Sequence, residues 1–403
     1  MINRDLYINK LVKWKDKKLI KVLTGMRRVG KSTLLLLYKN FLIKNGVDEK
    51  NIIYFNLEDL KYDYISDYKK LYDEIMKRLD ENNMNYIMID EIQNIDEFEK
   101  AINSLYIKDN VDIYLTGSNA KFLSSEIATI LTGRYIEINV LPLSFKEYLS
   151  SIREDSKYTS LSDDDLFQNY LLYGAMPFVR TLDDKKDDIE SYLDSIYNTV
   201  FAKDILKRIE IRNSELIDRL SKFMFDNIAN VTSINKITNA LCSAGIKISV
   251  PTVTTYLDTL CSAYLFYKIK RYDIKGKMLL KTQYKYYAVD VGLRNYVLGI
   301  ANRDLGRILE NIVYLELLRR EYKVYIGKMG DTEIDFVAEK AGIKKYYQVA
   351  SSVIDENTFL REIRPLEMIK DNYEKYVISY DKMPATDSDG IKVINVIDFL
   401  LEK

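Results

Sequence analysis

Four residues near the start of the chain have the types and the spacing of a phosphate-binding loop. Gly25, Gly30, Lys31 and Ser32 fit the pattern G-x-x-x-x-G-K-[ST], inside TGMRRVGKSTLLLLYKN at 24–40. The glycines let the backbone wrap tightly and aim its N–H groups at phosphate oxygens, Lys31 neutralises the phosphates, and the Ser32 hydroxyl offers a ligand to Mg²⁺. The pattern therefore predicts a site for ATP and Mg²⁺.

Neighbouring residues of the loop are expected to add contacts to the nucleotide. Arg28, Val29 and Thr33 lie beside the glycine and lysine positions. The helix that opens at Lys31 also presents its N-terminal dipole to the phosphates. Of the two adjacent arginines, Arg27 and Arg28, we expect at least one to face solvent or a partner. The alternative for the whole stretch is a glycine-containing turn without a ligand.

Two acids further along supply the remaining groups that hydrolysis needs. The run NYIMIDEIQ, 85–93, is typical of a buried strand and ends in Asp90 and Glu91. We expect Asp90 to hold the Mg²⁺ through water, and Glu91 to polarise the attacking water, with Lys31 as the other catalytic residue. The alternative for Glu91 is a solvated acid at a strand end.

A sheet is needed to position these side chains. KKLIKVLTG predicts a strand before the loop, and KSTLLLLYKNFLIKNG predicts a helix after it, closed by Gly46. In the sequence, a further strand, NIIYFNLED at 51–59, stands between this strand and the one at 85–93. An extra strand is typical of the ATPase branch with an inserted strand, rather than of simple nucleotide kinases.

Two later strands bring further candidates. VDIYLTGSN, 111–119, predicts a fourth strand with a polar tip, where Ser118 or Asn119 is placed to sense the γ-phosphate. GRYIEINVLPLSF, 133–145, predicts a fifth strand, entered through Arg134. Arg134 either acts as a finger on the nucleotide of a neighbouring subunit or is a surface arginine, and both interpretations stay open.

The middle of the chain is helical. Within 146–213, the turn in NYLLYGAMPFV (169–179) is expected to pack against the ATPase core. From residue 214, three helical runs lead into a β-hairpin with Gly276 at its turn. Three helices and a hairpin predict a winged helix-turn-helix.

The predicted hairpin is basic. It carries Lys268, Lys270, Arg271, Lys275, Lys277, Lys281 and Lys285. Such a wing suits contacts with DNA phosphates, whereas the candidate recognition helix, Thr252 to Ala263, has no lysine or arginine for reading bases. DNA contact and a purely structural packing role both stay open.

The last third has the outline of a metal-dependent nuclease core. Glu310 lies on a predicted helix and Asp335 on a predicted strand, as expected for acids that hold Mg²⁺. On the next strand, Gln348 takes the place of an acid and Ala350 the place of a lysine. Because the water-activating cation is missing, the pattern favours a nuclease-shaped scaffold without cleavage, and a DNA-cleaving enzyme is the alternative.

Composition removes several classes of mechanism. The 403 residues include no histidine, which excludes Ser-His-Asp systems and His-ligated zinc sites. Lysine plus arginine (60) equals aspartate plus glutamate (60), so any nucleic-acid binding needs a local patch. Cys242 and Cys261 are not in a C-x-x-C pair and are expected to be buried thiols. No apolar run is long enough for a membrane span and the N-terminus has no signal core, so we expect a cytoplasmic protein.

Taken together, the motifs resemble one family, the prokaryotic and especially archaeal AAA+-superfamily ATPases with a C-terminal domain related to restriction-endonuclease folds. The matching stretches include TGMRRVGKSTLLL, MIDEIQ, LTGSNA, LTGRYIEINVLPLSFKEYL, YLLYGAMPFV, RYDIKGKMLLKTQYKYYAVDVGLRN, GRILENIVYLELLRR and EIDFVAE. The resemblance implies ATPase roles for Gly25, Lys31, Ser32, Asp90 and Glu91. For the nuclease-like site, Glu310 and Asp335 match the family pattern, while Gln348 and Ala350 depart from that of active endonucleases.

The sequence as a whole predicts an α/β protein. The expected parts are a P-loop ATPase core at 1–145, a helical linker at 146–213, a winged helix at 214–297 and a nuclease-like α/β domain at 298–403. We expect Mg²⁺-dependent ATP hydrolysis, with the nucleotide state switching the arrangement of the later domains. A homo-oligomer is the candidate assembly. The alternatives are an ATP-gated DNA nuclease, and a nucleotide-binding scaffold or DNA-binding module without turnover.

Overall fold

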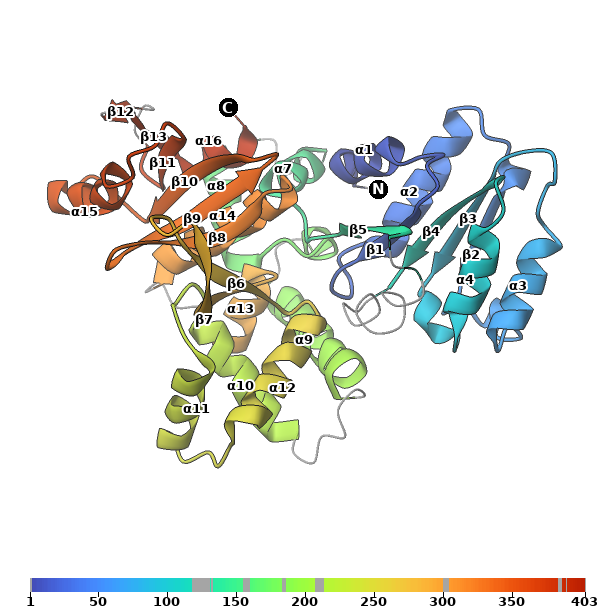
Figure 1. Cartoon of the computed structure of the whole chain (residues 1–403), viewed down its shortest axis with the longest axis horizontal. Helices are drawn as coiled ribbons and strands as arrows, with labels where there is room; N and C mark the ends of the chain where they lie inside the picture. Colours follow the sequence, from blue (N-terminus) through green and yellow to red (C-terminus); the bar gives the residue numbers. More distant parts are fainter. Residues whose placement is uncertain are drawn as a thin grey trace. The chain divides into compact units, whose positions relative to one another are not determined.

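A computed structural model describes most of the chain (Figure 1). The described residues are 2–117, 131, 133–154, 160–182, 186–206, 214–299, 304–382, 386–388 and 390–402. The chain divides into two compact units, one of residues 1–141 with 262–264, and one of residues 142–261 with 265–403. Within the described ranges, no helix combines the length and the apolar character needed to cross a membrane.

The first unit contains a five-stranded parallel sheet. Its strands are β1 (Ile20–Thr24), β2 (Ile52–Asn56), β3 (Asn85–Asp90), β4 (Val111–Thr116) and β5 (Tyr135–Asn139). They lie in the order β2-β3-β4-β1-β5, and every neighbouring pair is parallel. The strand that separates β1 from β3 in space is therefore β4, whereas the extra strand singled out in the sequence, β2, lies at the edge. Crossover connections allow this, because parallel neighbours need not be consecutive in the chain.

Helices cover both faces of this sheet (Figure 1). One face carries α1 (Asp5–Lys13) and α2 (Lys31–Lys44), and the other carries α3 (Tyr68–Met76) and α4 (Phe98–Tyr106). Short 3₁₀ turns occupy Glu49–Asn51, Leu60–Tyr62 and Ile92–Asn94. Because successive strand residues point to opposite faces, alternate residues of β1 to β4 meet α3 and α4 in one buried apolar cluster.

The second unit begins with helices. They are α7 (Phe145–Arg153), α8 (Asp163–Tyr173) and α9 (Lys186–Val200), with a 3₁₀ turn at Val179–Thr181 and a π-helical turn at Phe201–Ile205. The turn after α8 accepts, on its Ala175 oxygen, a hydrogen bond at 2.9 Å from the N–H of Leu143, a residue that the sequence analysis assigned to the ATPase core. It is held inside the second unit, where the Ala175 N–H donates to Asp290 Oδ2 at 2.7 Å. A buried carboxylate needs such donors, and Asp290 caps the helix α13 (Val291–Leu298) that packs on α8.

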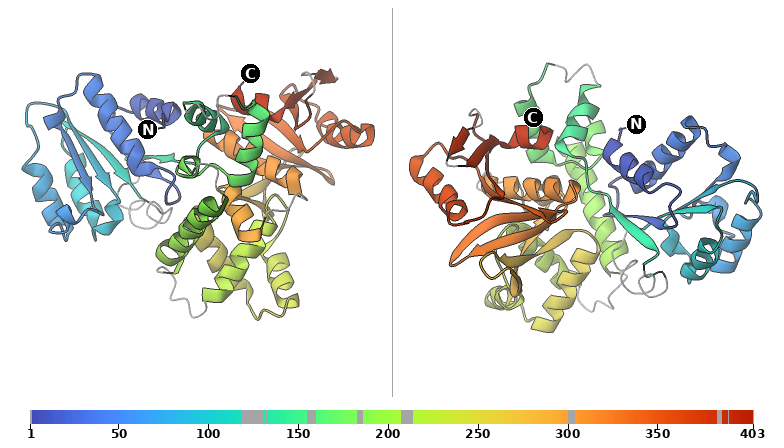
Figure 2. Two further views of the ribbon diagram at one scale, coloured as in Figure 1. Left: turned by 180° about the vertical axis from the view of Figure 1, so that it is seen from behind. Right: turned by 45° about the horizontal axis from the view of Figure 1, so that its top comes forward.

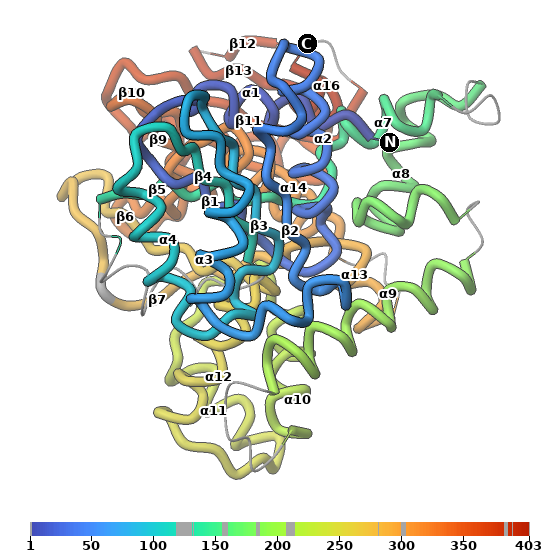
Figure 3. The backbone as a smooth tube through the Cα atoms, turned by 90° about the vertical axis from the view of Figure 1, so that its right-hand side faces the viewer, coloured from blue at the N-terminus to red at the C-terminus, as the bar shows by residue number. Residues whose placement is uncertain are grey.

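The expected three helices and hairpin are present in the second unit. They are α10 (Ser214–Asp226), α11 (Ile234–Ser243), α12 (Val250–Ser262), β6 (Phe266–Asp273) and β7 (Met278–Ala288). The helices lie next to one another (Figure 3). The hairpin does not stand apart, because β6 also pairs in parallel with β8, across the predicted domain boundary at 297. Cys242 at the end of α11 is exposed and Cys261 half-buried, so the prediction of two buried thiols was wrong.

An eight-stranded mixed sheet forms the rest of the second unit (Figure 2). Beyond β6 and β7 it contains β8 (Lys323–Met329), β9 (Thr332–Lys340), β10 (Ile343–Ala350), β11 (Glu374–Ser379), β12 (Thr386–Ser388) and β13 (Ile391–Asn395), in the order β12-β13-β11-β10-β9-β8-β6-β7. Its helices are α14 (Leu305–Arg319), α15 (Glu356–Glu367) and α16 (Val396–Leu401). Tyr346 joins the apolar cluster under α15, whereas its neighbour Tyr347 packs on Phe399 of α16, so the helices cover opposite faces.

Candidate functional site

The predicted phosphate loop connects β1 to α2. Gly25 and Gly30 have φ angles of 135° and 96°, a region in which side chains with a Cβ are strained. A Cβ on Gly25 would lie 2.3 Å from the backbone oxygen of Val140, so this position also lacks room for a side chain. Arg28 has a φ of 67°. The two glycines of the pattern therefore stand where the backbone of this loop needs a positive φ.

Lys31 lies at the first position of α2 with 4% of its surface exposed. Its ammonium donates to the backbone oxygens of Gly25, at 3.0 Å, and of Met26, at 3.1 Å. Val29 is buried as well, and its carbonyl oxygen accepts a hydrogen bond from Arg4 at 3.1 Å. The loop thus holds a buried cation at the N-terminus of a helix, which is the electrostatic arrangement that a polyphosphate needs.

The remaining residues of the loop differ in their exposure. Ser32 is half-buried, while Thr33 and Arg28 are exposed. Arg27 forms an ion pair with Glu58 at 3.6 Å. Of the two adjacent arginines, Arg28 is the one that faces solvent.

The two predicted acids lie at the carboxyl end of β3. Asp90 is 1% exposed and Glu91 6% exposed. The Thr116 hydroxyl at the end of β4 donates to Asp90 Oδ1 and accepts a hydrogen bond from the Glu91 N–H at 2.9 Å. Because β1, β3 and β4 are parallel, their carboxyl ends share the sheet edge that also carries the phosphate loop.

Glu91 has an unusual backbone and a shifted acidity. Its φ of 54° is left-handed, a conformation that residues with a Cβ rarely adopt outside tight turns. Burial raises the pKa of Glu91, while the positive charge of Lys31 and a hydrogen bond from Gln93 oppose that shift. A carboxylate with a raised pKa is a stronger proton acceptor than an ordinary glutamate, which suits a general base.

Arg134 lies at the opposite edge of the sheet. It directly precedes β5, whose register with β1 pairs Ile20 with Tyr135. Its side chain donates to Asn103 Oδ1 at 2.5 Å and lies over the ring of Tyr106. The five residues of β1 separate the two edges by about 16 Å, so Arg134 does not reach the phosphate loop of its own chain. Ser118 and Asn119 lie outside the described residues.

The residues of the predicted nuclease-like site, Glu310, Asp335 and Gln348, lie close together in the second unit. The Asp335 N–H donates to Gln348 Oε1 at 2.7 Å, and Lys285 contacts both Asp335 and Glu310. Lys285 was counted among the basic residues of the predicted wing, for which DNA contact and a packing role both stayed open, but its side chain is only 3% exposed. Lys285 lies in the buried C-terminal part of β7, far along the strand from the hairpin turn at Gly276.

Lys285 supplies an ammonium that sequence reasoning missed. Its Nζ lies 2.7 Å from Glu310 Oε1, 2.8 Å from Glu333 Oε1 and 3.2 Å from Asp335 Oδ1. Burial, together with the nearby Asp335 carboxylate, raises the pKa of Glu310 to about 7. Within the described part of the chain, no group of acidic or cysteine side chains is arranged to hold a metal ion.

The other basic residues of the hairpin are more accessible. Lys270, Lys275 and Lys277 are exposed. Lys268 lies over the ring of Tyr284, at 4.3 Å from its centre, and Arg271 donates to Gln283. The hairpin turn thus keeps the positive charge that phosphate contacts require, and the side chain of Lys281 lies outside the described part.

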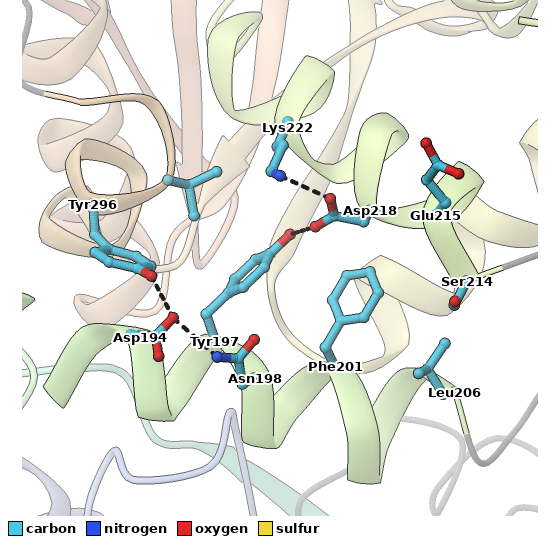
Figure 4. Close-up of a pocket in the computed structure, with 11 residues that line it drawn as sticks. Asp194, Tyr197, Asn198, Phe201, Leu206, Ser214, Glu215, Asp218, Lys222 and Tyr296 are labelled. Carbon is cyan, nitrogen blue, oxygen red and sulfur yellow. Dashed lines mark hydrogen bonds and ion pairs between the residues drawn. The ribbon is translucent and has the colours of Figure 1, made fainter. Parts of the chain in front are cut away.

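A cavity of about 560 Å³ lies between α9, α10 and α13 of the second unit (Figure 4). In the close-up, Tyr197 extends across it towards Asp218, to which its hydroxyl donates at 2.9 Å. Tyr296 donates to Asp194 on the other side. None of the site residues predicted from the sequence lines this cavity.

Comparisons with known proteins support the ATPase-like fold of the first unit. The AAA domain family matches residues 17–149, and a domain of unknown function, DUF8612, matches residues 164–304. In structure, the chain is similar to the Walker-type ATPase paby2304 of Pyrococcus abyssi, with a TM-score of 0.52 and 15% identity over 74% of this chain and 96% of that one. This similarity shows the fold alone. The fold and the loop define a P-loop ATPase domain of the AAA class.

Two relatives match over the whole chain. An uncharacterised protein of Haemophilus influenzae is 41% identical over 403 residues, which cover all of this chain and 99% of the relative. An uncharacterised protein of Methanocaldococcus jannaschii is 32% identical over 414 residues, covering all of this chain and 87% of the relative. The chain belongs to the family of these two proteins. The winged-helix and nuclease-like interpretations of its second unit stay predictions.

Proposed function

We propose that this protein binds ATP with Mg²⁺ at the loop between β1 and α2 and hydrolyses it. The observation that carries the proposal is the buried ammonium of Lys31 within an AAA domain, at the sheet edge where Asp90 and Glu91 are also buried. An ammonium group at the N-terminus of a helix, beside the N–H groups of the loop, suits the negative charge of a triphosphate.

The donor groups at this edge fit Mg²⁺. Ser32 on the first turn of α2 and Asp90 at the end of β3 offer hydroxyl and carboxylate oxygens, which are the ligands that Mg²⁺ prefers. Bound there, the ion neutralises charge on the phosphates. The backbone N–H groups of the loop and Lys31 orient the β- and γ-phosphates, with Arg28, Val29 and Thr33 beside them.

We assign to Glu91 the role of activating the water that attacks the γ-phosphate. Its carboxyl group is buried, and Gln93 and the Thr116-bonded backbone hold it in place. In this position it accepts a proton from the attacking water, or orients that water, as hydrolysis proceeds. Ser118 or Asn119 is proposed to sense the γ-phosphate. For Arg134, the roles of a finger and of a surface arginine both stay open, and its place at the opposite edge of the sheet supports a finger only for the nucleotide of a neighbouring subunit in a homo-oligomer.

The nucleotide state is proposed to act as a switch on the second unit. The exposed lysines at the hairpin turn support contact with DNA phosphates as part of that role. For the alternative of an ATP-gated DNA nuclease, Lys285 supplies the amine that was missing beside Glu310 and Asp335. Its ammonium group, however, lies between the two acids, where a metal ion would have to bind. Plasmid nicking with Mg²⁺ or Mn²⁺ and ATP that is lost in Asp335→Ala supports the nuclease alternative.

The central experiment compares wild type with Lys31→Ala. Calorimetric titration with Mg²⁺–ATP and a phosphate-release assay should both give signals in the wild type and lose them in the variant. Lys44→Ala is the matched control, because Lys44 is an exposed lysine at the end of the same helix. Binding without phosphate release in the wild type would instead support a scaffold without turnover.

A further inference from the structure

One ammonium is surrounded by three carboxylates inside the second unit. Lys285 comes from β7, Glu310 from α14, and Glu333 and Asp335 from β9. Their oxygens lie between 2.7 Å and 3.2 Å from the Lys285 nitrogen. The Lys285 ammonium donates hydrogen bonds to Glu310 and Asp335 and forms an ion pair with Glu333. All three acids therefore contact the same positive charge.

Lys285 and Glu310 are the buried members of this cluster, and neighbouring groups support it further. The side chains of Lys285 and Glu310 are 3% and 10% exposed. The Tyr287 hydroxyl donates to the same Glu310 oxygen at 2.6 Å, and the Val349 N–H donates to Asp335 Oδ2 at 3.0 Å. Glu310 and Asp335 are thereby each fixed in orientation by a neutral donor as well as by the ammonium.

Acids gathered in this way, with Glu310 buried and Asp335 and Glu333 half-buried, favour a positive charge among them. Without one, their mutual repulsion and the lost hydration of Glu310 would disfavour the ionised state. The charge can come from a bound cation or from the chain itself. Here the chain supplies it, and the acids meet around the ammonium rather than around open space, in agreement with the absence of a metal-holding group among the described residues.

We propose that Lys285 is the resident cation of this cluster, which keeps the cluster free of divalent metal, and that removal of its ammonium turns the same carboxylates into a divalent-cation site. The acids, Glu310 and Asp335 above all, then hold Mg²⁺ or Mn²⁺ through oxygen atoms. In the wild type the cluster instead ties β7 to α14 and β9. The second unit thus contains a metal-free, internally neutralised centre, and this proposal is independent of ATP hydrolysis.

The test measures Mn²⁺ binding without nucleotide, by electron paramagnetic resonance of free Mn²⁺, in wild type, Lys285→Met and Lys285→Met/Asp335→Asn. Methionine keeps the length of the side chain and removes its charge. We expect Lys285→Met to gain Mn²⁺ binding and to show a raised thermal midpoint with Mn²⁺. The added Asp335→Asn change should abolish both gains, which assigns the site to the cluster and not to the phosphate loop.

Two further variants keep the test decisive if Lys285→Met does not fold. Lys285→Arg retains a cation and should bind no more Mn²⁺ than wild type. Asp335→Asn in the wild-type background should leave Mn²⁺ binding unchanged. Mn²⁺ binding by the wild type that depends on Asp335 overturns the proposal, because the metal would then displace the ammonium. A folded Lys285→Met variant that gains no Mn²⁺ also overturns it.

Discussion

The hydroxyl group of Thr116 donates a hydrogen bond to the carboxylate of Asp90, and both side chains are buried at the carboxyl edge of the five-stranded sheet. The same hydroxyl oxygen accepts the Glu91 N–H at 2.9 Å. One side chain on β4 therefore holds the proposed metal ligand and the backbone of the proposed catalytic acid together. In the proposed hydrolysis, this relationship assigns Thr116 the part of a positioning residue.

Replacing Thr116 by valine keeps the shape of the side chain and removes its hydroxyl. Asp90 then loses a donor and the Glu91 N–H loses its acceptor, so we expect turnover to fall about tenfold or more, which is about 1.4 kcal/mol in the barrier. ATP affinity should change much less. Steady-state kinetics and calorimetry measure the two effects, and Thr116→Ser, which keeps the hydroxyl, should retain most of the activity. Equal loss in both variants would contradict a role for the hydroxyl.

Glu91→Gln is expected to separate binding from hydrolysis. The amide has nearly the shape of the carboxyl group but cannot accept the proton of the attacking water, so phosphate release should fall by about 10²- to 10⁴-fold while ATP affinity persists. Because burial raises the pKa of Glu91, the wild-type rate should rise with pH up to a value above that of an ordinary glutamate. Unchanged turnover in Glu91→Gln would show that the water is polarised by another group.

Gly25→Ala should destabilise the first unit and weaken ATP binding. The added Cβ would meet the Val140 oxygen at 2.3 Å, in a backbone with a φ of 135°. Both effects together should cost about 1–3 kcal/mol of unfolding free energy. Gly46→Ala is the matched control. Gly46 also has a positive φ, of 89°, but a Cβ added to it would have no atom within 4 Å. A loss no larger than that of Gly46→Ala would refute the steric contribution.

Asp290 is expected to make stability depend on pH. It is buried, and burial raises its pKa to about 6, from an ordinary value of 3.8. A carboxyl group with a raised pKa in the folded state stabilises the fold below the unfolded pKa. That stability is lost as the pH rises towards 6, by an amount on the order of 3 kcal/mol. Urea unfolding of the wild type between pH 4 and pH 7 measures this decline.

The variant Asp290→Asn provides the comparison. It does not titrate, so the difference in unfolding free energy between wild type and variant should change over the same pH range. The variant is also expected to be less stable at every pH, because its amide nitrogen cannot accept the N–H of Ala175 while its oxygen serves that of Leu293. A difference that stays constant with pH would show that Asp290 does not titrate in this range.

Much of the first unit could be predicted from the sequence. The loop, its flanking strand and helix, and the acids after β3 are local patterns, in which a few neighbouring residues carry the whole signal. The AAA domain match confirms the class that they predicted. Thr116 was not among the predicted site residues, because the polar residues after this strand carried the stronger sequence signal. The pairing of Ile89 with Leu115 across β3 and β4 places it opposite Asp90, and the sequence does not contain that pairing.

By itself, the sequence determined where a phosphate loop begins, which strands and helices flank it, and that an acid pair follows a buried strand, because each depends on residues within a few positions of one another. Only the tertiary structure decided that β4 separates β1 from β3, that Arg134 lies at the opposite edge of the sheet, and that Lys285 meets Glu310 and Asp335. Those contacts join residues 25 to 50 positions apart. No periodicity links such positions, since the packing of whole elements, and not local geometry, brings them together.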